Sequence, residues 1–241
     1  MGTEKGAVEV FKAWAVTYDK TVSKELERYA GITHQEVLDR LLQLAQLQNG
    51  DLVLDVGTGT GWLAIRCALK MEEGQIIGVD ITPEMLAQAA LNTEKVGVSE
   101  RVQFALASAM SLPYPDNQFD VMLSSIALHH TTVSQSLDEM VRVLKPGGRI
   151  AIADMGAPTA WRSAPLSWLI LLLPRAGKLT GNPRVRAEAE AFQQTYTAEE
   201  WTSLLAAKGL KRAQVTAIPR ADQRLYPCLI LASGQKEDAI G

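Results

Sequence analysis

Acidic residues around a glycine cluster give the first indication of chemistry in this sequence. Asp55 stands two residues before the cluster GTGTG, at 57–61, and Asp80 follows about 20 residues later. Glycines lack a Cβ, so the backbone can turn sharply and approach a ligand closely. A carboxylate at the later position can accept hydrogen bonds from both hydroxyls of a ribose. The pattern therefore favours a site for a nucleoside-containing ligand.

The spacing of the glycines separates two classes of ligand. Dinucleotide sites favour G-x-G-x-x-G/A, and here the third small position is Trp62, which is too large for close packing of helix and strand. Asp55 would repel a pyrophosphate but suits a ligand that carries an ammonium or a sulfonium group. A nicotinamide-dependent oxidoreductase is disfavoured but stays open, as does an ordinary glycine turn in an α/β protein.

A pair of histidines, His129 and His130, follows a predicted strand at 119–125. Ligands of open α/β folds bind at the carboxyl edge of the sheet, so the pair is well placed for catalysis. Adjacent side chains point different ways, and we expect at most one to face a substrate. His130 is the first candidate for a general base, His129 the second and Tyr196 the third. A purely structural role for both histidines stays open.

An alternation of strands and helices positions these candidates. Apolar runs predict buried parallel strands at 52–56, 75–80, 101–106, 119–125 and 149–154. Thr82 is expected to be the N-cap of a helix, with Pro83 at its first position. KPGG, at 145–148, is expected to end a later helix. A capping box at Thr197 then begins a last helix, before a hairpin at 210–218 and 225–233.

Four motifs in this order, VLDVGTGTG, GVDITPEML, LPYPDNQFDVMLSSIALHH and RVLKPGGRIAIAD, give the chain its resemblance to a known family. The chain resembles class I S-adenosylmethionine-dependent methyltransferases, most of all the branch with the quinone-biosynthesis C-methyltransferases. The resemblance runs from about Phe11 to Asp154, with a weaker tail to Ser233. It implies an α/β fold with a Rossmann-like seven-stranded sheet, order 3-2-1-4-5-7-6 with strand 7 antiparallel, flanked by helices, and a helical lid between strands 5 and 6.

The resemblance also implies which residues hold S-adenosylmethionine. They are Asp55, Gly57, Thr58, Gly59, Gly61, Asp80, Ile81, Met85, Ser108, Ala109, Ser125 and Tyr18. An acid commonly stands in the family where Ser108 stands here, and a hydroxyl accepts a hydrogen bond from adenine without the strengthening charge. FKAWAVTYD, at 11–19, resembles the segment with which many of these enzymes cover the cofactor, with simple helix packing as the alternative.

Composition bears on partners and compartment. A net charge of −3 and a pI of about 5.7 give no strong attraction to nucleic acid. The two cysteines, Cys67 and Cys228, suit a reducing compartment, and three histidines are too few for a convincing metal cluster, so we expect no metal. No apolar leader opens the chain, and we expect a cytoplasmic protein.

The whole chain, 1–241, is expected to form one domain. Its parts are an N-terminal helical segment at 1–50, a cofactor-binding core at 51–154, a lid insertion at 155–196, and the last helix with the hairpin at 197–233. The lid contains an apolar run at 166–173, too short to span a bilayer and followed by basic residues. We expect a mobile lid over a hydrophobic acceptor, with peripheral membrane contact through 161–186, or else a roof that only completes the core.

The predicted reaction is methyl transfer from S-adenosylmethionine to a small hydrophobic acceptor such as a phenol or quinol. Alignment of nucleophile, methyl carbon and sulfur is expected to supply most of the rate. A nucleic-acid methyltransferase is disfavoured by the acidic pI and by the lack of an Asn-Pro-Pro-aromatic motif. A cofactor-binding protein of the same fold without catalysis stays open. The acceptor and the oligomeric state are beyond the sequence.

Overall fold

One mostly parallel sheet organises the computed structural model. Seven strands lie in the order β3-β2-β1-β4-β5-β7-β6. Strands β1 to β5 pair in parallel, and β7 is antiparallel to both of its neighbours. The bounds are β1 (Leu52–Val56), β2 (Gln75–Asp80), β3 (Val102–Leu106), β4 (Phe119–Ser125), β5 (Leu144–Gly156), β6 (Leu210–Ile218) and β7 (Cys228–Lys236). The sheet order and the direction of strand 7 confirm the predicted fold class.

The structure describes residues 11–12, 18–163, 167, 189–218 and 227–238. Most of the predicted lid lies outside them, including the apolar run at 166–173 except for residue 167, and all of the basic residues that follow. Trp14 and Ala15 of the predicted N-terminal cover, and the expected start of the last strand at 225, also lie outside the described residues.

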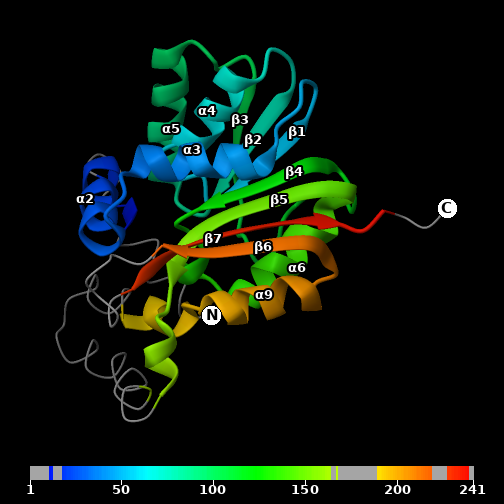
Figure 1. Cartoon of the computed structure of the whole chain (residues 1–241). Helices are drawn as coiled ribbons and strands as arrows, with labels where there is room; N and C mark the ends of the chain where they lie inside the picture. Colours follow the sequence, from blue (N-terminus) through cyan, green and yellow to red (C-terminus); the bar gives the residue numbers. More distant parts are fainter. Residues whose placement is uncertain (1–10, 13–17, 164–166, 168–188, 219–226, 239–241) are drawn as a thin grey trace.

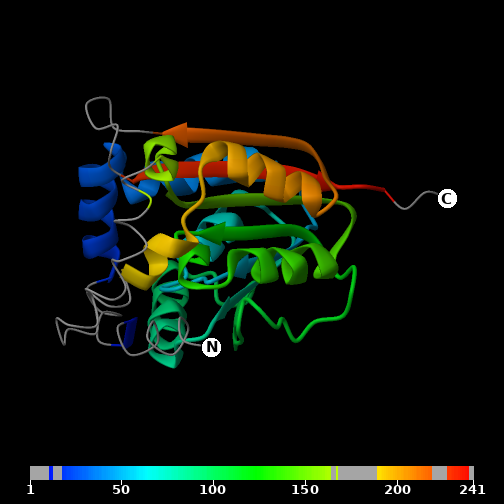
Figure 2. The ribbon, with the colours of Figure 1, turned by 90° about the horizontal axis from the view of Figure 1, so that it is seen from below.

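Helices cover both faces of the sheet, as Figures 1 and 2 show. On one face lie α3 (His34–Ala45) and α4 (Trp62–Lys70), with α5 (Pro83–Val96) beside α4; on the other lie α6 (Val133–Val143) and α9 (Ala198–Ala207). Short 3-10 turns are η1 (Leu128–His130), η2 (Thr159–Arg162) and η3 (Phe192–Gln194). Helix α2 (Tyr18–Ala30) lies at the left of both views, beside the carboxyl ends of the parallel strands. Ligands of open α/β folds bind at that edge.

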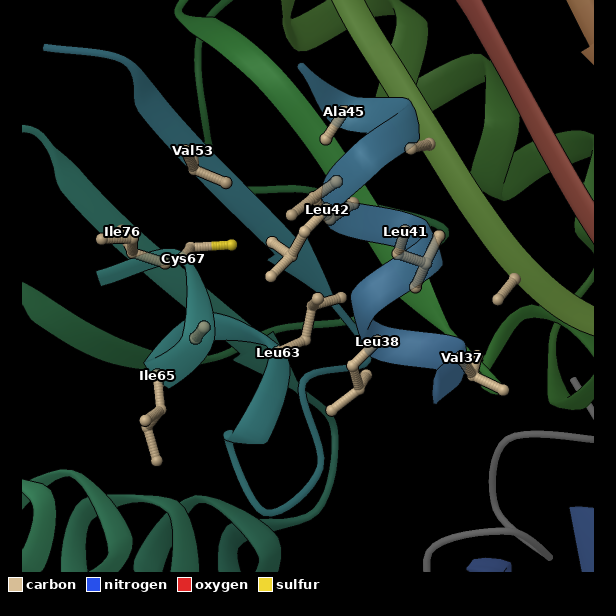
Figure 3. Packing of buried hydrophobic residues seen from close by; sticks show 14 of the residues in the cluster. Val37, Leu38, Leu41, Leu42, Ala45, Val53, Leu63, Ile65, Cys67 and Ile76 are labelled. Atoms are coloured by element: carbon tan, nitrogen blue, oxygen red, sulfur yellow. The ribbon is translucent and has the colours of Figure 1, made fainter. Parts of the chain in front are cut away.

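Apolar side chains fill the space between the sheet and the helices in two clusters, one on each face. Figure 3 shows part of the first cluster, where Leu38 and Leu42 of α3 gather with Val53 of β1 and Cys67 of α4. Val53 belongs to this cluster and its neighbour Leu54 to the other. Strand β1 is therefore buried on both faces, as its continuous apolar run predicts. A packed core of this kind holds the strand ends in fixed positions.

Capping signals in the sequence set the starts of two helices, with one departure. Thr197 and Glu200 form the predicted capping box of α9. Thr82 is the N-cap of α5 with Pro83 in the first turn, as predicted, but its side chain makes no capping hydrogen bond. Its backbone N–H instead donates to Oδ1 of Asp80 at 2.9 Å. The start of α5 is therefore tied to the candidate ribose ligand.

The fifth strand is longer than the sequence indicates. We expected KPGG to separate a helix from a strand that begins at Arg149, but α6 ends at Val143 and β5 begins at Leu144. The pairing of β4 with β5 shifts register between Phe119 and Val121. The strand is irregular at 145–148 because these residues include a proline and two glycines. The apolar run at 149–154 therefore predicted only the regular part of the strand.

Candidate active site

A pocket opens at the carboxyl edge of the sheet, between the glycine cluster, the end of β2, the loops after β3 and β4, and the N-terminal segment. Its lining residues are Phe11, Tyr18, Gly57, Gly59, Asp80, Ile81, Thr82, Met85, Ala107, Ala109, Ile126, Ala127, Leu128, His130 and Thr131. The candidates predicted from the sequence that line it are Tyr18, Gly57, Gly59, Asp80, Ile81, Met85, Ala109 and His130. Residues from five separate segments therefore meet at one place.

The other predicted residues do not line this pocket; they are Asp55, Thr58, Gly61, Ser108, Ser125, His129 and Tyr196. A Cβ on Gly61 would lie 2.9 Å from Cβ of Ala89, so glycine there lets α4 pack against α5. The Ser108 hydroxyl accepts from the N–H of Met110 at 3.1 Å. Tyr196 packs against Trp201 of α9, with ring centroids 6.1 Å apart.

The backbone holds Asp80 in a position that leaves room for a ligand. Its Oδ2 accepts from the N–H of Gly59 at 3.0 Å, and its Oδ1 from the N–H of Thr82 at 2.9 Å. A carboxylate has about four lone-pair positions, so about two remain for a ligand in the pocket. Burial raises the pKa of Asp80, and the backbone hydrogen bonds oppose that rise. The arrangement suits the two hydroxyls of a ribose.

Asp55 lies behind the glycine cluster and is 1% exposed. Its Oδ2 accepts from the Thr58 hydroxyl at 2.6 Å, and its Oδ1 makes no hydrogen bond to the described part of the chain. Burial raises the pKa of Asp55 to about 7. A buried carboxylate oxygen without a partner is unfavourable, so a cationic group of a ligand at the cluster would stabilise the ionised form.

Glycines 57 and 59 let three segments approach one another. Gly57 has φ +71°, and a Cβ there would lie 2.4 Å from Cβ of Ala127 in the loop after β4. Gly59 has φ +54°, and its Cβ would lie 3.7 Å from the ring of Tyr18. Only glycine adopts such left-handed backbone without strain. The glycine cluster therefore packs closely against both the loop after β4, through Gly57, and the N-terminal segment, through Gly59.

Asp19 fastens the first turn of α2 to the start of α4. Its Oδ1 accepts from the Thr60 hydroxyl at 2.6 Å, and its Oδ2 from the indole N–H of Trp62 at 2.8 Å. Tyr18, next to Asp19, and Phe11 both line the pocket, with their ring centroids 6.0 Å apart. Asp19 was not singled out in the sequence because its partners lie more than 40 residues away. The indole N–H of Trp62, the residue whose size disfavours a dinucleotide, thus ties α2 to the segment after the glycine cluster.

The two histidines occupy different environments. His130 lines the pocket, and its ring lies edge-on to Phe11 with centroids 4.9 Å apart. His129 is 2% exposed, and its Nδ1 lies 2.5 Å from Oδ1 of Asp154. The two imidazole centroids are 4.0 Å apart. One member of the pair thus faces the pocket, and the other connects it to a buried carboxylate.

Burial lowers the pKa of His130 well below its usual value, and the neighbouring His129 adds to this shift. His130 is therefore neutral at pH 7 and can accept a proton. Asp154 was missed in the sequence, although a signal was present. Like Asp55 and Asp80, it is an acid that follows a buried apolar run at the carboxyl end of a strand.

Within the residues that the structure describes, no three His, Cys, Asp or Glu side chains gather closely enough to hold a metal ion. None of the described helices is both long enough and apolar enough to cross a membrane.

Comparisons with known proteins match most of the chain. A family model described as a methyltransferase domain matches residues 47–209. The ubiquinone/menaquinone biosynthesis C-methyltransferase UbiE of Azotobacter vinelandii is 31% identical over 210 residues, which cover 85% of this chain and 81% of the relative. The protein of the same name from Pseudomonas putida is 31% identical over 214 residues, covering 86% and 82%.

Solved structures share the architecture. The cyclase SpnF matches with a TM-score of 0.65 at 24% identity, over 85% of this chain and 81% of that one. Geranyl diphosphate C-methyltransferase from Streptomyces coelicolor, solved with geranyl diphosphate and S-adenosyl-L-homocysteine, matches with a TM-score of 0.64 at 13% identity, over 91% and 84%. At these identities the likeness shows the fold alone.

Proposed function

This chain belongs to the class I S-adenosylmethionine-dependent methyltransferases, and we propose that it methylates a ring carbon of a hydrophobic quinol. S-adenosylmethionine is its cofactor, which supplies a methyl group activated by a sulfonium sulfur, and its acceptor is a small molecule. The observation that carries the proposal is that a neutral imidazole, His130, lines the same pocket as Asp80 and the glycine cluster. The names of the curated relatives, quinone-biosynthesis C-methyltransferases, favour a ring carbon over oxygen or nitrogen.

We assign the cofactor to the pocket at the carboxyl edge on two observations of its fit. Asp80 keeps lone pairs for the ribose hydroxyls, and Oδ1 of Asp55 lacks a hydrogen-bond partner in the described part of the chain. The apolar side chains of Ile81 and Met85 would flank the adenine. The remaining predicted ligands, Gly57, Thr58, Gly59, Gly61, Ser108, Ala109, Ser125 and Tyr18, stay assigned to this cofactor as contacts or supports.

His130 acts as the general base in this proposal. A quinol ring carbon becomes nucleophilic when the adjacent hydroxyl loses its proton, and His130 accepts that proton. A carbon–carbon bond would form at the ring carbon as the methyl–sulfur bond breaks, with S-adenosylhomocysteine as the leaving product. Loss of the proton from that ring carbon would restore the aromatic ring, and the oxygen would regain the proton that His130 accepted. One proton is released overall for each methyl group transferred. Besides alignment of the ring carbon, the methyl carbon and the sulfur, this reaction needs a base that contacts the pocket.

Asp154 and His129 position the base. The Nδ1–H of His129 donates to Oδ1 of Asp154, which also accepts the N–H of Met155 at 2.9 Å. A carboxylate that fixes one imidazole in this way sets its tautomer and its orientation. Because the His129 ring contacts the His130 ring, the fixed ring limits how His130 can rotate. His129 therefore supports the base from behind the pocket wall.

Cytoplasmic location, the absence of a nucleic-acid partner and peripheral membrane contact through 161–186 remain proposals that rest on composition and sequence. The described residues of 161–186 bear on the proposed membrane contact. Trp161 is 7% exposed and packs against Phe192 with centroids 5.5 Å apart, and Arg162 pairs with Glu200. Membrane contact would therefore depend on residues after this point.

A panel of acceptors with methyl-labelled cofactor tests the proposed function. Lipophilic quinols, simple phenols and amines are incubated with the protein, and the products are separated and identified. We expect label in a quinol and little in an amine. Transfer only to an amine or to a phenol oxygen would overturn carbon methylation. Transfer to no acceptor, by protein that still binds S-adenosylhomocysteine, would favour the non-catalytic alternative.

A further inference from the structure

The turn that carries His130 is too short to hold its own shape. It is η1, a single 3-10 turn between β4 and α6. The N–H of His130 donates to the carbonyl of Ala127 at 3.1 Å, and the N–H of Thr131 donates to the carbonyl of Leu128 at 2.8 Å. Hydrogen bonds in 3-10 turns have poor geometry, and one turn contains few of them. Contacts from neighbouring elements must therefore fix the direction of the imidazole.

Two buried hydroxyls in series connect this turn to α6. The Thr131 hydroxyl donates to the carbonyl of Leu128 at 2.7 Å, and its oxygen lies 2.8 Å from the hydroxyl oxygen of Ser136. Thr131 has a single hydroxyl proton, which goes to Leu128, so Ser136 is the donor in the second bond. Thr131 is 9% exposed and Ser136 is 0% exposed. The hydroxyl chain thus runs from Ser136 through Thr131 to the first residue of η1.

Ser136 bonds outside its own helix, although a partner within the helix is available. A serine hydroxyl in a helix can donate to the carbonyl four residues earlier, which here belongs to Thr132. The N–H of Ser136 donates to that carbonyl at 3.0 Å, but its hydroxyl bonds to Thr131. Hydrogen bonds in series polarise and strengthen one another where water is excluded. The hydroxyl chain therefore fastens the turn to α6.

We infer that Thr131 and Ser136 are positioning residues, whose hydroxyls hold η1 in the conformation that directs the His130 imidazole at the pocket. The inference rests on the proposed function and deepens it, because it names the residues that hold the proposed base. The rotamers open to a side chain depend on its backbone φ and ψ, so a relaxed turn would let the ring move away. Thr131 lines the pocket, but its hydroxyl is bonded to the protein and acts through His130.

The base is then held from two sides. On one side His129 bonds to Asp154 of β5, and on the other Thr131 bonds to Ser136 of α6. The two neighbours of His130 in sequence are thus each attached to a different element, while His130 itself lines the pocket. Loss of the attachment to α6 leaves the attachment to β5 intact. Variants of the hydroxyl chain should therefore loosen the ring without unfolding the site.

A simpler explanation is that the two hydroxyls only satisfy each other. Buried polar groups are hydrogen-bonded in most proteins, whether or not they lie near a site. Under that explanation, removal of either hydroxyl would change the stability of the fold and leave the surroundings of the His130 ring as they are. Under the positioning role, the ring itself would change its surroundings, so a measurement on the ring separates the two.

The pKa of His130 reports where its ring lies. Burial is the largest cause of its low pKa, and His129 is the second. Other ionisable groups around it are Asp154, which bonds to His129, and Tyr18 and Asp80, which line the same pocket. The other described elements that pack on η1 are α6 and η3, and neither η3 nor the first turn of α6 contains an ionisable side chain. A ring that moves toward water should therefore regain a pKa closer to 6.5.

NMR titration of the histidine rings tests the inference without any substrate. The chain has three histidines, and the signal of His130 is the one lost in His130→Ala. Thr131→Val keeps the shape of the side chain and removes its hydroxyl, and Ser136→Ala removes the other hydroxyl. Each should raise the pKa of His130 by about half a pH unit or more. Thr131→Ser keeps the hydroxyl and should keep the wild-type pKa.

Turnover of the quinol gives a second readout. Thr131→Val should lower kcat by about tenfold, because a small misplacement of a catalytic group has a large effect on rate, and Ser136→Ala should lower it by less. The two hydroxyls form one chain, so the double variant should lose little more than Thr131→Val alone. Affinity for S-adenosylhomocysteine, measured by calorimetry, should stay close to that of the wild type.

Thr132→Val is the matched control. It makes the same change at the next residue, which is exposed and whose side chain makes no capping hydrogen bond to α6. This control should keep the wild-type kcat and the wild-type pKa of His130. Ser136→Ala tests the same hydroxyl chain if Thr131→Val does not fold.

The outcomes separate positioning from the reaction. A pKa of His130 in Thr131→Val and Ser136→Ala equal to that of the wild type would overturn the inference while the proposed function stands. An equal loss of kcat in Thr131→Ser and Thr131→Val would also overturn it, because the hydroxyl would then have no effect. If the wild type methylates no quinol, the proposed function fails, and the NMR titration decides the inference alone.

Discussion

His130 lines the pocket and is the proposed general base. Because its pKa lies well below 6.5, the ring is unprotonated at neutral pH. His130→Ala should lower kcat by about 100-fold or more, which is a common loss for a general base, with little change in cofactor affinity. Steady-state kinetics and titration calorimetry with S-adenosylhomocysteine measure the two effects.

His34→Ala is the control for this prediction. His34 is also partly buried, but it lines a different hollow and does not face the cofactor pocket. A kcat of His130→Ala within about threefold of wild type would mean that alignment alone carries the reaction, or that the base is another group.

The raised pKa of Asp55 makes cofactor binding depend on pH. The cationic amino group of the cofactor interacts better with the ionised carboxylate than with the neutral acid. Affinity for S-adenosylhomocysteine should therefore rise up to tenfold per pH unit as pH increases to about 7, and then level off. Asp55→Asn should remove this dependence in calorimetry from about pH 5.5 to 8.5. A parallel pH dependence in wild type and variant would show that another group is responsible.

The same residue has the opposite effect on the stability of the cofactor-free protein. A folded-state pKa above the unfolded value, 3.8 here, means that the folded state binds the proton more tightly. Stability from Asp55 is therefore present below about pH 4 and lost as pH rises to about 7. Binding of the cofactor should offset this loss, because its cation favours the ionised form.

Residues at strand ends were the part of the site that could be predicted. Asp80 ends one apolar run, and His130 lies in the loop that follows another. Because the carboxyl ends of parallel strands share one edge of the sheet, this order places both residues at the pocket. The partners of His129 and Trp62 could not be predicted. Asp154 and Asp19 reach them through packing between segments that are distant in sequence.

At the scale of elements, α2 is attached to the cofactor site through one side chain. Asp19→Ala removes the hydrogen bonds to the Thr60 hydroxyl and the Trp62 indole. Loss of two bonds to a partly exposed carboxylate should loosen the cover and weaken S-adenosylhomocysteine binding by roughly tenfold. Stopped-flow kinetics should show that most of the loss in affinity comes from faster dissociation of S-adenosylhomocysteine.

Lys24→Ala, at an exposed position of the same helix, should leave both rates unchanged. Unaltered dissociation from Asp19→Ala would show that α2 does not need this attachment to cover the pocket.

Element types were predictable where apolar periodicity was continuous, and element ends were predictable where a cap was encoded. Strand β1 and the start of α9 are examples of each. The start of β5 was not, because Leu144 pairs with Phe119 of β4 before KPGG, a sequence that is typical of a turn, and the register shifts between this pair and the next. The expected lid could not be compared, because most of it lies outside the described residues.

At the scale of the whole molecule, the cofactor should stabilise the fold, because the pocket assigned to it is lined by residues from five separate segments of the chain. S-adenosylhomocysteine at 100 times its Kd adds about 2.7 kcal/mol to the free energy of unfolding. For a chain of 241 residues this should raise Tm by roughly 5–10 °C. Differential scanning fluorimetry measures the shift, and the organisation of residues 1–241 as one domain predicts a single transition.

Asp80→Ala should show less than half of that shift at the same ligand concentration, because it loses both ribose hydrogen bonds. Glu94→Ala, which removes an exposed carboxylate from α5, should keep the full shift. Equal shifts for Asp80→Ala and wild type would mean that Asp80 does not bind the ribose.

The position of the transferred methyl group tests the central claim most directly. The wild-type protein and His130→Ala are each incubated with a hydrophobic quinol and S-adenosylmethionine labelled with ¹³C in its methyl group, and the product is analysed by NMR. We predict a labelled methyl group on a ring carbon, formed by the wild type and strongly reduced in His130→Ala. Label on oxygen, or equal carbon methylation by both proteins, would contradict the account of a ring-carbon methyltransferase with His130 as its base.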